Sequence, residues 1–390
     1  MYSLLLAIIY VAFISLGLPD SLLGSAWPVM YGELGVPISL AGIITMIIAG
    51  GTIVSSLLSD KLTRKWGAGL VTAASVFLTA AALFGFSVSR SFLLLCIWAV
   101  PYGLGAGAVD AALNNYVALH YASRHMSWLH CFWGVGAAVS PYIMSYSLTN
   151  GAGWQNGYRT VSLIQIILTV FLFASLPLWK KNKILNTETS PREGGLPIHK
   201  VIRITGVPFV LISFFAYCAL ESTAMLWASS YLVQVRGIDT EAAAQFSSLF
   251  FLGITFGRLL CGFIADKIGD INLIRIGICI LTAGILLILI PFTADFFSLT
   301  GFLVVGLGCA PIYPSIIHAT PYRFGKENSQ SIIGIQMASA YVGSTFMPPL
   351  FGLIAAHIEI GLLPVFLLIF AFLMLFMSEK LNKTVPYTLS

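Results

Sequence analysis

Charged side chains are scarce in this 390-residue chain. Asp, Glu, Lys and Arg make up 9% of the residues, whereas a soluble domain carries about 25%. Fifteen acidic and twenty basic residues cannot cover the surface of a soluble protein of this length, which excludes a water-soluble globule and a disordered chain. The six cysteines all lie inside apolar stretches, which excludes a scaffold built on disulfides.

Motifs of the common enzyme classes are missing as well. The sequence contains no Gly-x-x-x-x-Gly-Lys-Ser/Thr, no His-Glu-x-x-His and no Gly-x-Ser-x-Gly, which are the patterns of phosphate binding, zinc hydrolysis and serine catalysis. No spacing of cysteine and histidine suggests a metal site. We therefore expect that the protein is not an enzyme and binds no cofactor and no metal.

Long apolar runs dominate what is present. A membrane-spanning helix needs about 20 mostly apolar residues, and none of the runs alternates in polarity as the strands of a membrane barrel would. The first run lacks a basic leader and a cleavage site, so we expect it to be a retained helix. The sequence predicts an all-α membrane protein with twelve spans, at residues 4–30, 39–58, 67–87, 91–118, 127–148, 160–179, 207–233, 243–264, 273–292, 297–318, 331–356 and 361–378.

The basic residues are distributed unevenly between the two sides of these spans. With both termini on one side, that side holds sixteen of the twenty Lys and Arg residues, and the other side holds three. Lys and Arg concentrate in cytoplasmic loops, so we expect a multi-pass plasma-membrane protein with both termini in the cytoplasm. The net charge of +5 is then explained by topology, and we expect no nucleic-acid partner.

A polar stretch in the middle of the chain divides the spans into two sets of six. We expect an N-terminal bundle at 1–179, a cytoplasmic linker at 180–206 and a C-terminal bundle at 207–390 with a short cytoplasmic tail. Three pairs of local matches at nearly one offset suggest that the bundles are an internal repeat. The matches are Asp60-Lys61 with Asp266-Lys267, each nine residues after a glycine (Gly51, Gly257), Gly103-Leu104-Gly105 with Gly306-Leu307-Gly308, and Gly136 and Pro141 with Gly343 and Pro348.

This arrangement resembles a major facilitator superfamily transporter over essentially the whole chain. The signature of that family between spans two and three is Gly-x-Leu-Ala-Asp-Arg-x-Gly-Arg-Lys or a close variant. The two copies here read Ser56-Leu57-Leu58-Ser59-Asp60-Lys61-Leu62-Thr63-Arg64-Lys65, in which both glycines are replaced, and Gly262-Phe263-Ile264-Ala265-Asp266-Lys267-Ile268-Gly269. The resemblance implies a conformational latch formed by Asp60, Lys61, Arg64, Arg258, Asp266 and Lys267, although a solvated charge cluster would look the same in sequence.

A narrower resemblance lies in spans four and five. The segments Gly105-Ala106-Gly107-Ala108-Val109-Asp110-Ala111-Ala112-Leu113-Asn114-Asn115-Tyr116 and Trp128-Leu129-His130-Cys131-Phe132-Trp133-Gly134-Val135-Gly136 are similar to the fucose/galactose/glucose:proton symporter branch. This resemblance implies functional acids in the first and fourth spans, which would be Asp20 and Asp110. The Arg of the drug-exporter signature in span four is absent.

Three acids lie deep within the expected spans: Asp20, Asp110 and Glu221. Placing an Asp at the centre of a membrane helix costs about 2.5–3.5 kcal/mol, and such residues usually line an ion or solute path. No Lys accompanies them, and we expect Arg258 to lie nearer the cytoplasmic surface. A carboxylate that binds a proton loses the charge that makes its burial costly, so we expect these three acids to couple transport to protons.

Each acid also has a structural interpretation. Asp20 follows Pro19, where the helix can break, and its carboxylate could bond freed backbone amides. Asp110 lies one turn from Asn114, with which it would form a polar patch on one face of the helix. Glu221 could be a hydrogen-bonded structural acid between helices.

Sugars combine hydroxyl groups with apolar ring faces, so their sites contain amides and aromatic rings. Most aromatic residues in membrane helices pack or anchor at the interface, and His130 could be an ordinary hydrogen-bonded histidine. Trp27 and Trp133 are further aromatic candidates. We select as substrate-binding candidates Asn114, Asn115, Trp128, His130, Trp227, Tyr313 and Gln336.

The sequence therefore predicts a secondary active transporter that works by alternating access, as a monomer in the lipid bilayer. Its partners would be protons and a small polar solute such as a monosaccharide. One alternative is a proton-coupled exporter of drugs or amphipathic compounds, which would use the same acids in a more apolar cavity. Another is a solute sensor without turnover, which would be expected to carry an added output domain.

Overall fold

The structure is a computed structural model that describes all residues except 1, 38–39, 180–196, 239, 291–294 and 387–390. The described residues are helices and short connections, without strands. They form two compact units. Unit 1 comprises Met1–Tyr116 and Phe132–Gly195, and unit 2 comprises Val117–Cys131 and Leu196–Ser390. Most of the expected linker, residues 180–196, lies outside the described part.

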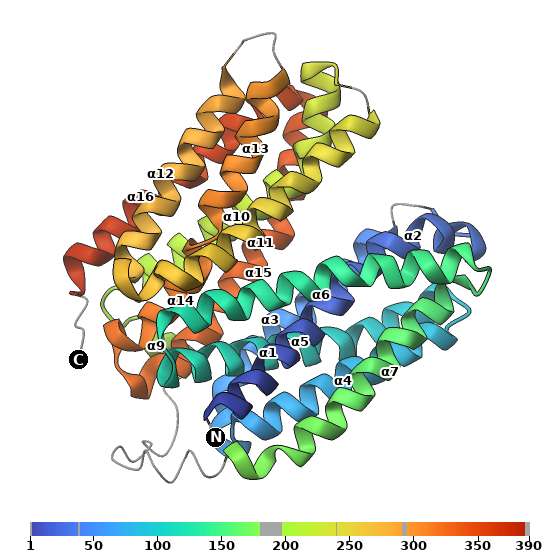
Figure 1. The fold of residues 1–390 in the computed structure, drawn as a ribbon, viewed down its shortest axis with the longest axis horizontal. Coiled ribbons are helices and arrows are strands. Elements are labelled where there is room, and N and C mark those ends of the chain that lie inside the picture. The colour runs from blue at the N-terminus through green and yellow to red at the C-terminus, as the bar shows by residue number, and fades with distance from the viewer. Residues whose placement is uncertain (1, 38–39, 180–196, 239, 291–294, 387–390) are drawn as a thin grey trace. The chain divides into compact units, whose positions relative to one another are not determined.

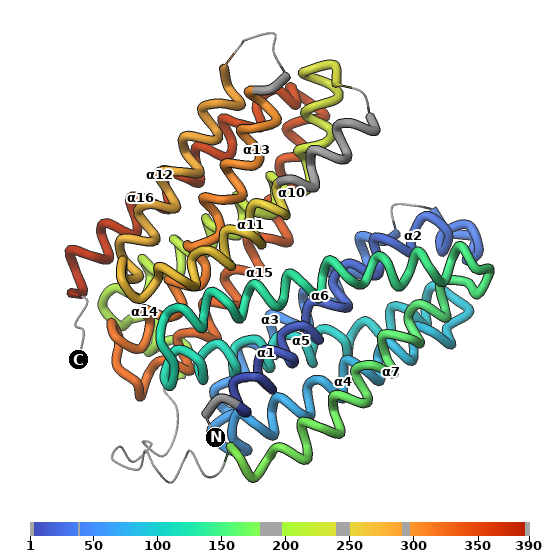
Figure 2. Tube along the Cα trace, viewed as in Figure 1, coloured from blue at the N-terminus to red at the C-terminus, as the bar shows by residue number. Residues whose placement is uncertain are grey.

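Unit 1 is built from seven described helices, and the ends of two of them, α5 and α6, belong to unit 2 (Figures 1 and 2). The helices are α1 (Tyr2–Asp20), α2 (Leu22–Glu33), α3 (Ala41–Trp66), α4 (Ala68–Val88), α5 (Phe92–His120), α6 (Ser123–Thr149) and α7 (Gly153–Ala174).

Unit 2 contains the remaining helices. They are α9 (Ile198–Val201), α10 (Val207–Arg236), α11 (Thr240–Ile268), α12 (Asp270–Leu289), α13 (Asp295–Cys309), α14 (Ile312–Phe324), α15 (Lys326–His357), the 3₁₀ turn η2 (Ile360–Leu362) and α16 (Leu363–Thr384).

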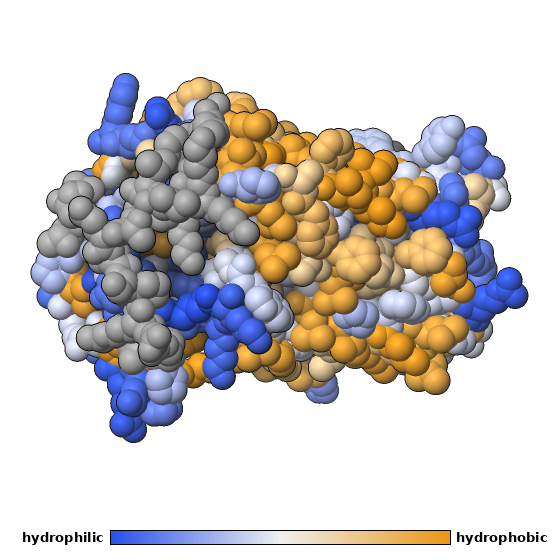
Figure 3. Space-filling view, turned by 90° about the horizontal axis from the view of Figure 1, so that it is seen from below, coloured by the Kyte–Doolittle hydropathy of each residue, from blue (hydrophilic) through white to orange (hydrophobic). Residues whose placement is uncertain are grey.

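The helices match the twelve predicted spans once two breaks are recognised. The pairs α1/α2 and α13/α14 each make one span, and ten spans are long and apolar enough to cross a membrane in the described part of the chain. Helices α6 and α11 complete the set. On the face drawn in Figure 3, hydrophobic side chains form a broad band with hydrophilic residues at its two ends, as expected for a surface that meets lipid. The all-α membrane fold is therefore confirmed.

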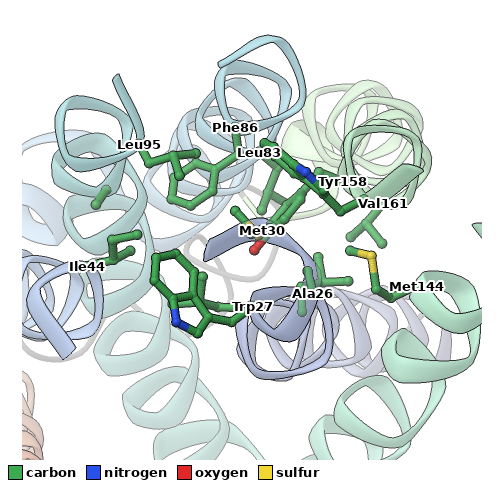
Figure 4. Packing of buried hydrophobic residues seen from close by; sticks show 14 of the residues in the cluster. Ala26, Trp27, Met30, Ile44, Leu83, Phe86, Leu95, Met144, Tyr158 and Val161 are labelled. Atoms are coloured by element: carbon green, nitrogen blue, oxygen red, sulfur yellow. The ribbon is translucent and has the colours of Figure 1, made fainter. Parts of the chain in front are cut away.

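A hydrophobic core holds the helices of unit 1 together at one end. Trp27 and Met30 of α2 pack with Ile44 of α3, Phe86 of α4 and Tyr158 of α7 (Figure 4). Trp27 is 5% exposed. It is thus a packing residue, as most aromatic residues in membrane helices are.

Glycines allow the same close helix crossings in both units. A Cβ on Gly103 would lie 2.2 Å from the carbonyl oxygen of Ile48, and one on Gly306 would lie 2.3 Å from that of Phe250. These contacts join α3 to α5 in unit 1 and α11 to α13 in unit 2. Small residues at such crossings let membrane helices approach closely.

A second crossing repeats in the same way. A Cβ on Gly136 of α6 would lie 2.0 Å from the carbonyl oxygen of Ile14 in α1, and one on Gly343 of α15 would lie 2.6 Å from that of Phe215 in α10. Two of the three matched pairs in the sequence therefore occupy equivalent helix contacts, which confirms the internal repeat.

The third match is shifted by one helical turn. Gly51 packs on Gly103, and the residue that packs on Gly306 is Gly253, whereas Gly257 packs on Ala310. The pairing of Gly51 with Gly257 was therefore wrong by four residues. Because four residues are close to one turn of 3.6 residues, both choices face the same neighbouring helix, and the sequence could not distinguish them.

The glycine crossings give a direct prediction. Replacing Gly103 or Gly306 by Ala should lower the stability by about 1–3 kcal/mol, because the new methyl group would overlap a backbone carbonyl. The measurement is the thermal unfolding of each purified variant in detergent. Gly50→Ala is the matched control in α3, because a Cβ there would meet nothing within 4 Å. Equal melting temperatures for Gly103→Ala and Gly50→Ala would contradict the crossing.

Candidate functional site

Helix α1 ends at Asp20 because Pro19 precedes it. Proline has no amide hydrogen, so it leaves the carbonyl four residues earlier without its helical partner. That carbonyl belongs to Ser15, and the side-chain amide of Gln165 donates to it at 2.7 Å. Gln165 is 1% exposed. Helix α7 thereby stabilises the break in α1 that positions Asp20.

The carboxylate of Asp20 is held by neutral donors. The indole N–H of Trp133 donates to its Oδ2 at 2.9 Å, and the hydroxyl of Tyr102 donates to its Oδ1 at the longer distance of 3.4 Å. Asp20 itself is exposed. Among the described residues, no ion pair within 4.0 Å includes Asp20, and its hydrogen-bond partners are side chains and not the freed backbone amides.

The crossing of α1 and α6 explains why Trp133 reaches Asp20. A Cβ on Gly17 would lie 2.0 Å from the carbonyl oxygen of Trp133, so the two backbones touch at this point. Asp20 follows Gly17 by one turn of α1, which places its carboxylate near the indole of Trp133. The small residues at 17 and 136 thus determine the geometry of the acid.

Asp110 and Asn114 form a polar pair one turn apart in α5. The amide of Asn114 donates to Oδ1 of Asp110 at 2.8 Å and to its backbone carbonyl at 3.0 Å. Asp110 is half-buried, and its charge acts electrostatically on Asp20. Asn115 is buried, and its side-chain oxygen has no hydrogen-bond partner among the described residues. Unit 1 therefore brings both of its predicted acids and one predicted amide into one electrostatic site.

Glu221 has a cationic partner. The guanidinium of Arg258 lies 3.4 Å from its Oε1, with side-chain exposures of 4% and 15%. We expected Arg258 nearer the cytoplasmic surface, with the latch. The structure places it eight residues before Asp266 on α11, about 12 Å along the helix axis, where it faces α10. The sequence could not reveal this pairing across two helices.

An aromatic group surrounds this ion pair in unit 2. The rings of His130 and Phe214 each lie 4.6 Å from the ring of Tyr313, and the ring of Tyr217 lies 6.0 Å from it. The charge of Arg258 acts on both His130 and Tyr313. Four predicted site residues, Glu221, Arg258, His130 and Tyr313, therefore form one cluster, which we call the Glu221 cluster.

The remaining substrate candidates make structural contacts. Gln336 is fully buried and shares a hydrogen bond of 3.1 Å with Thr320. The indole of Trp227 donates to the carbonyl of Pro348 at 3.0 Å. Trp128 packs its indole against Gly262, where a Cβ would lie 1.9 Å from its Nε1.

The first copy of the loop motif is helical. Arg64 donates to Asp60 at 2.8 Å within α3, and Lys61 is exposed. Ser56, which replaces a signature glycine, donates its hydroxyl to the carbonyl of Gly107 in α5 at 3.2 Å. Thr63 replaces the second glycine, and the helix continues past it to Trp66, where Gly67 ends it with a φ of 81°. The replacement of glycine by Thr63 therefore moves the end of the helix to Gly67.

In the second copy, Gly269 ends α11 with a φ of 79°, three residues after Asp266. Asp60 lies seven residues before its own terminal glycine, which is one helical turn deeper. This shift explains why Asp60 is buried and Asp266 is exposed. Within unit 2, Asp266 pairs with Arg124 at 3.3 Å, while Lys267 is exposed.

A second acid in this region, Asp270, was not recognised from the sequence. It is 1% exposed, accepts a hydrogen bond from the hydroxyl of Ser123 at 2.6 Å and lies 2.7 Å from Nδ1 of His318. The other ring nitrogen of His318 lies 3.1 Å from the carbonyl of Tyr121. Asp266 and Asp270 together attach the α5–α6 connection to α11, α12 and α14 within unit 2.

Sequence reasoning missed the partners more often than the acids. Tyr102 and Arg124 contact the predicted residues Asp20 and Asp266, which are far away in the chain. Gln165 contacts the carbonyl of Ser15, and His318 contacts Asp270. Of these contacts, only that of His318 with Asp270 could have been predicted from the sequence. An acid and a histidine near the ends of two spans on the same side of the membrane are close enough to form a pair. For Tyr102 and Gln165 we find no signal in the sequence.

The two acids of the second motif copy should differ in their contribution to stability. Asp270→Ala removes one partner of a buried pair, which should cost about 3 kcal/mol. Asp266→Ala removes an ion pair whose side chains are 51% and 37% exposed, which should cost about 1 kcal/mol or less. Thermal unfolding of the two purified variants measures the difference, and similar small losses for both would show that the Asp270 contacts do not form.

Comparisons with known proteins agree with this architecture. The sequence profile described as Major Facilitator Superfamily matches residues 9–328 and again residues 246–386. The Saccharomyces cerevisiae protein "Bypass of stop codon protein 6" is 22% identical over 91% of this chain and 77% of its own length. The probable nitrate/nitrite antiporter NarK1 of Thermus thermophilus is 24% identical over 85% of this chain and 82% of its own. The glucose/mannose transporter GlcP of Bacillus subtilis is 21% identical over 88% and 86%.

Solved structures share the fold at low sequence identity. The fucose:proton symporter FucP of E. coli, in its outward conformation, has a TM-score of 0.73 at 13% identity and covers 96% of this chain and 98% of its own. The proton:xylose symporter XylE has a TM-score of 0.77 at 13% identity, with coverages of 97% and 94%. The twelve spans, the repeated glycine crossings and the profile match lead to one conclusion: the chain belongs to the Major Facilitator Superfamily of membrane transporters.

Proposed function

We propose that this protein is a proton-coupled symporter of a small polar solute such as a monosaccharide, working by alternating access. The observation that carries the proposal is the Asp20 carboxylate, which is held at a helix break by an indole and a hydroxyl and has no ion-pair partner within 4.0 Å among the described residues. Asp110 adds a second negative charge that acts on the same group.

This geometry suits a group that binds and releases a proton. Two nearby carboxylates repel each other when both are ionised, and one bound proton relieves the repulsion. The indole and the hydroxyl hold Asp20 in place whether its carboxyl group is ionised or protonated. Neither donor is charged, so protonation of Asp20 leaves no unbalanced charge behind. Asn114, whose amide donates to Asp110, would also hydrogen-bond the solute.

The relatives support the solute class. FucP and XylE are described as proton symporters of fucose and xylose, and GlcP as a glucose/mannose transporter. These parallels favour a monosaccharide over a purely hydrophobic compound.

Glu221 has a different role in this proposal. Protonation of Glu221 would leave the buried guanidinium of Arg258 without its counter-charge, which is unfavourable in a low-dielectric interior. Glu221 therefore contributes to coupling through Arg258, while Asp20 and Asp110 bind the proton. The paired charges of Asp266 on α11 and Arg124 on α6 would serve as a latch that stabilises one conformation, whereas Asp60 and Arg64 pair within α3.

The proposal includes the expected setting of the protein. The excess of Lys and Arg on one side of the spans supports a plasma-membrane location with both termini in the cytoplasm. The substrate pathway of a transporter with two bundles needs no second copy of the chain, so we propose a monomer.

A second candidate function is transport of an organic anion. Arg258 favours it, because a buried guanidinium binds carboxylates and other planar anions well. A solute carboxylate would then replace Glu221 as the partner of Arg258. One relative, NarK1, is described as a probable antiporter of nitrate and nitrite.

Reconstituted transport tests the main proposal. Proteoliposomes with an imposed inward proton gradient should accumulate a labelled monosaccharide from a panel of glucose, mannose, fucose and xylose. Asp20→Asn should abolish accumulation of the solute and retain counterflow exchange. The solute site remains in this variant, but its amide neither binds nor releases a proton. Glu33→Gln is the matched control, since that acid bonds Trp154 within unit 1 and has no part in the proposed coupling. Accumulation by Asp20→Asn equal to that of the unchanged protein would refute the coupling role.

Variants of the Glu221–Arg258 pair test whether the solute is a neutral sugar or an organic anion. Glu221→Gln alone should destabilise the protein by about 3 kcal/mol, because it leaves Arg258 buried without its partner. The double variant Glu221→Gln/Arg258→Gln should recover most of the loss in thermal unfolding. The double variant should still exchange a neutral sugar by counterflow, which needs no coupling to protons. Transport of glucuronate in the unchanged protein and its loss in the double variant would favour the organic anion.

A further inference from the structure

Unit 2 contains a pocket at the ends of four helices, away from the Glu221 cluster. It is a shallow depression lined by residues of α10, α12, α14 and α16. Ile271 and Arg275 lie in the first six residues of α12, Arg323 is the next-to-last residue of α14, and Asn382 is the third from the end of α16. The pocket therefore lies within about 10 Å of the helix ends, which is the depth of the lipid headgroup region.

A continuous hydrogen-bonded chain of polar side chains lines its rim. Arg275 donates twice to Glu379, at 2.6 and 2.8 Å, and joins α12 to α16, which lie side by side in Figure 1. The amide of Asn382 donates to the same carboxylate at 3.3 Å, and Arg323 donates to the side-chain oxygen of Asn382. Two guanidinium groups and one carboxylate leave the rim with a net charge of +1.

The interior of the pocket is mainly apolar. Its lining includes Val210, Ile274, Ile316, Ala319 and Leu381. The rim remains accessible, because the side chains of Arg275 and Glu379 are 46% and 34% exposed. A cationic rim over an apolar floor fits a molecule that has an anionic group at one end and a hydrocarbon portion at the other.

Two further lysines increase the positive charge beside the rim. Lys380 and Lys383 are exposed on the same last turns of α16, and the ammonium group of Lys380 lies 4.6 Å from the ring centre of Phe209 in α10. Basic groups between membrane helices at this depth bind the headgroups of acidic lipids, and each contributes a several-fold gain in affinity.

We propose that the Arg275–Arg323 pocket of unit 2 is a binding site for an anionic phospholipid, whose headgroup phosphate contacts the two guanidinium groups and whose acyl chains begin along the apolar floor. The phosphate displaces part of the Glu379 contact on Arg275, so Glu379 limits the affinity of the site. This site is independent of the proposed transport function, because it shares no residue with the Asp20 group or the Glu221 cluster.

Lipid titration of the purified full-length protein tests the proposal without a transport assay. In a mild non-ionic detergent, short-chain phosphatidylglycerol should raise the melting temperature at lower concentration than phosphatidylcholine of the same chain length. The variant Arg275→Gln/Arg323→Gln should bind phosphatidylglycerol about 20-fold more weakly, because two basic contacts are lost. Arg90→Gln, which removes one exposed charge from unit 1, should keep the full preference.

Two further variants keep the test decisive if the double glutamine variant does not fold. Arg275→Lys/Arg323→Lys retains both charges and should retain the preference for phosphatidylglycerol. Glu379→Gln should strengthen binding of phosphatidylglycerol, whereas a network that only joins helices would give equal or weaker binding. Unchanged or weaker binding in Glu379→Gln overturns the proposal. The proposal is also overturned if the double glutamine variant folds and still prefers phosphatidylglycerol to phosphatidylcholine. The same holds if inorganic phosphate alone raises the melting temperature of the unchanged protein as much as phosphatidylglycerol does.

Discussion

A carboxylate in a membrane helix must be held by protein groups, because the surrounding hydrocarbon supplies neither hydrogen bonds nor counter-charge. The two units of this transporter meet that requirement differently. Unit 1 holds Asp20 with an indole and a hydroxyl, so the acid keeps its neighbours whether it is charged or neutral. Unit 2 holds Glu221 with a buried guanidinium, so its charge is tied to that of its partner. The first arrangement permits a change of protonation at low cost, and the second resists it.

Both arrangements depend on how closely the helix backbones approach. The glycines at 17 and 136 let α1 and α6 touch, which brings Trp133 to Asp20. On α3, where glycine is replaced in the loop motif, Ser56 compensates by bonding a carbonyl of α5. The site of unit 1 is therefore supported by contacts that contain no charge and that are repeated, at the glycines, in unit 2.

The sequence predicted the fold well and the site only partly, for reasons that particular residues make clear. Spans and repeated glycines are local patterns, so their length and spacing are readable directly. Asp20, Asp110 and Glu221 stood out because acids are rare in such segments. Tyr102, a partner of Asp20, did not, because it lies on another helix and belongs to a residue type common in ordinary packing. Arg258 stood out as a buried base, but its pairing with Glu221 on another helix could not be read from the sequence. The one-turn shift of the loop motif was also hidden, because Thr63 and Gly67 are both plausible positions for the end of a helix and only the backbone conformation of Gly67 decides between them.

The contact between Gln165 and the helix break at Pro19 predicts that these two residues occur together among homologues. The amide of Gln165 bonds a carbonyl that is available only because proline interrupts α1, so each residue is useful only in the presence of the other. A lineage that lost the proline would keep a buried amide facing a carbonyl already occupied by the restored helix. Substitutions at these two positions are therefore expected to occur together among homologues, and a homologue that has lost the proline is expected to have a continuous first membrane helix.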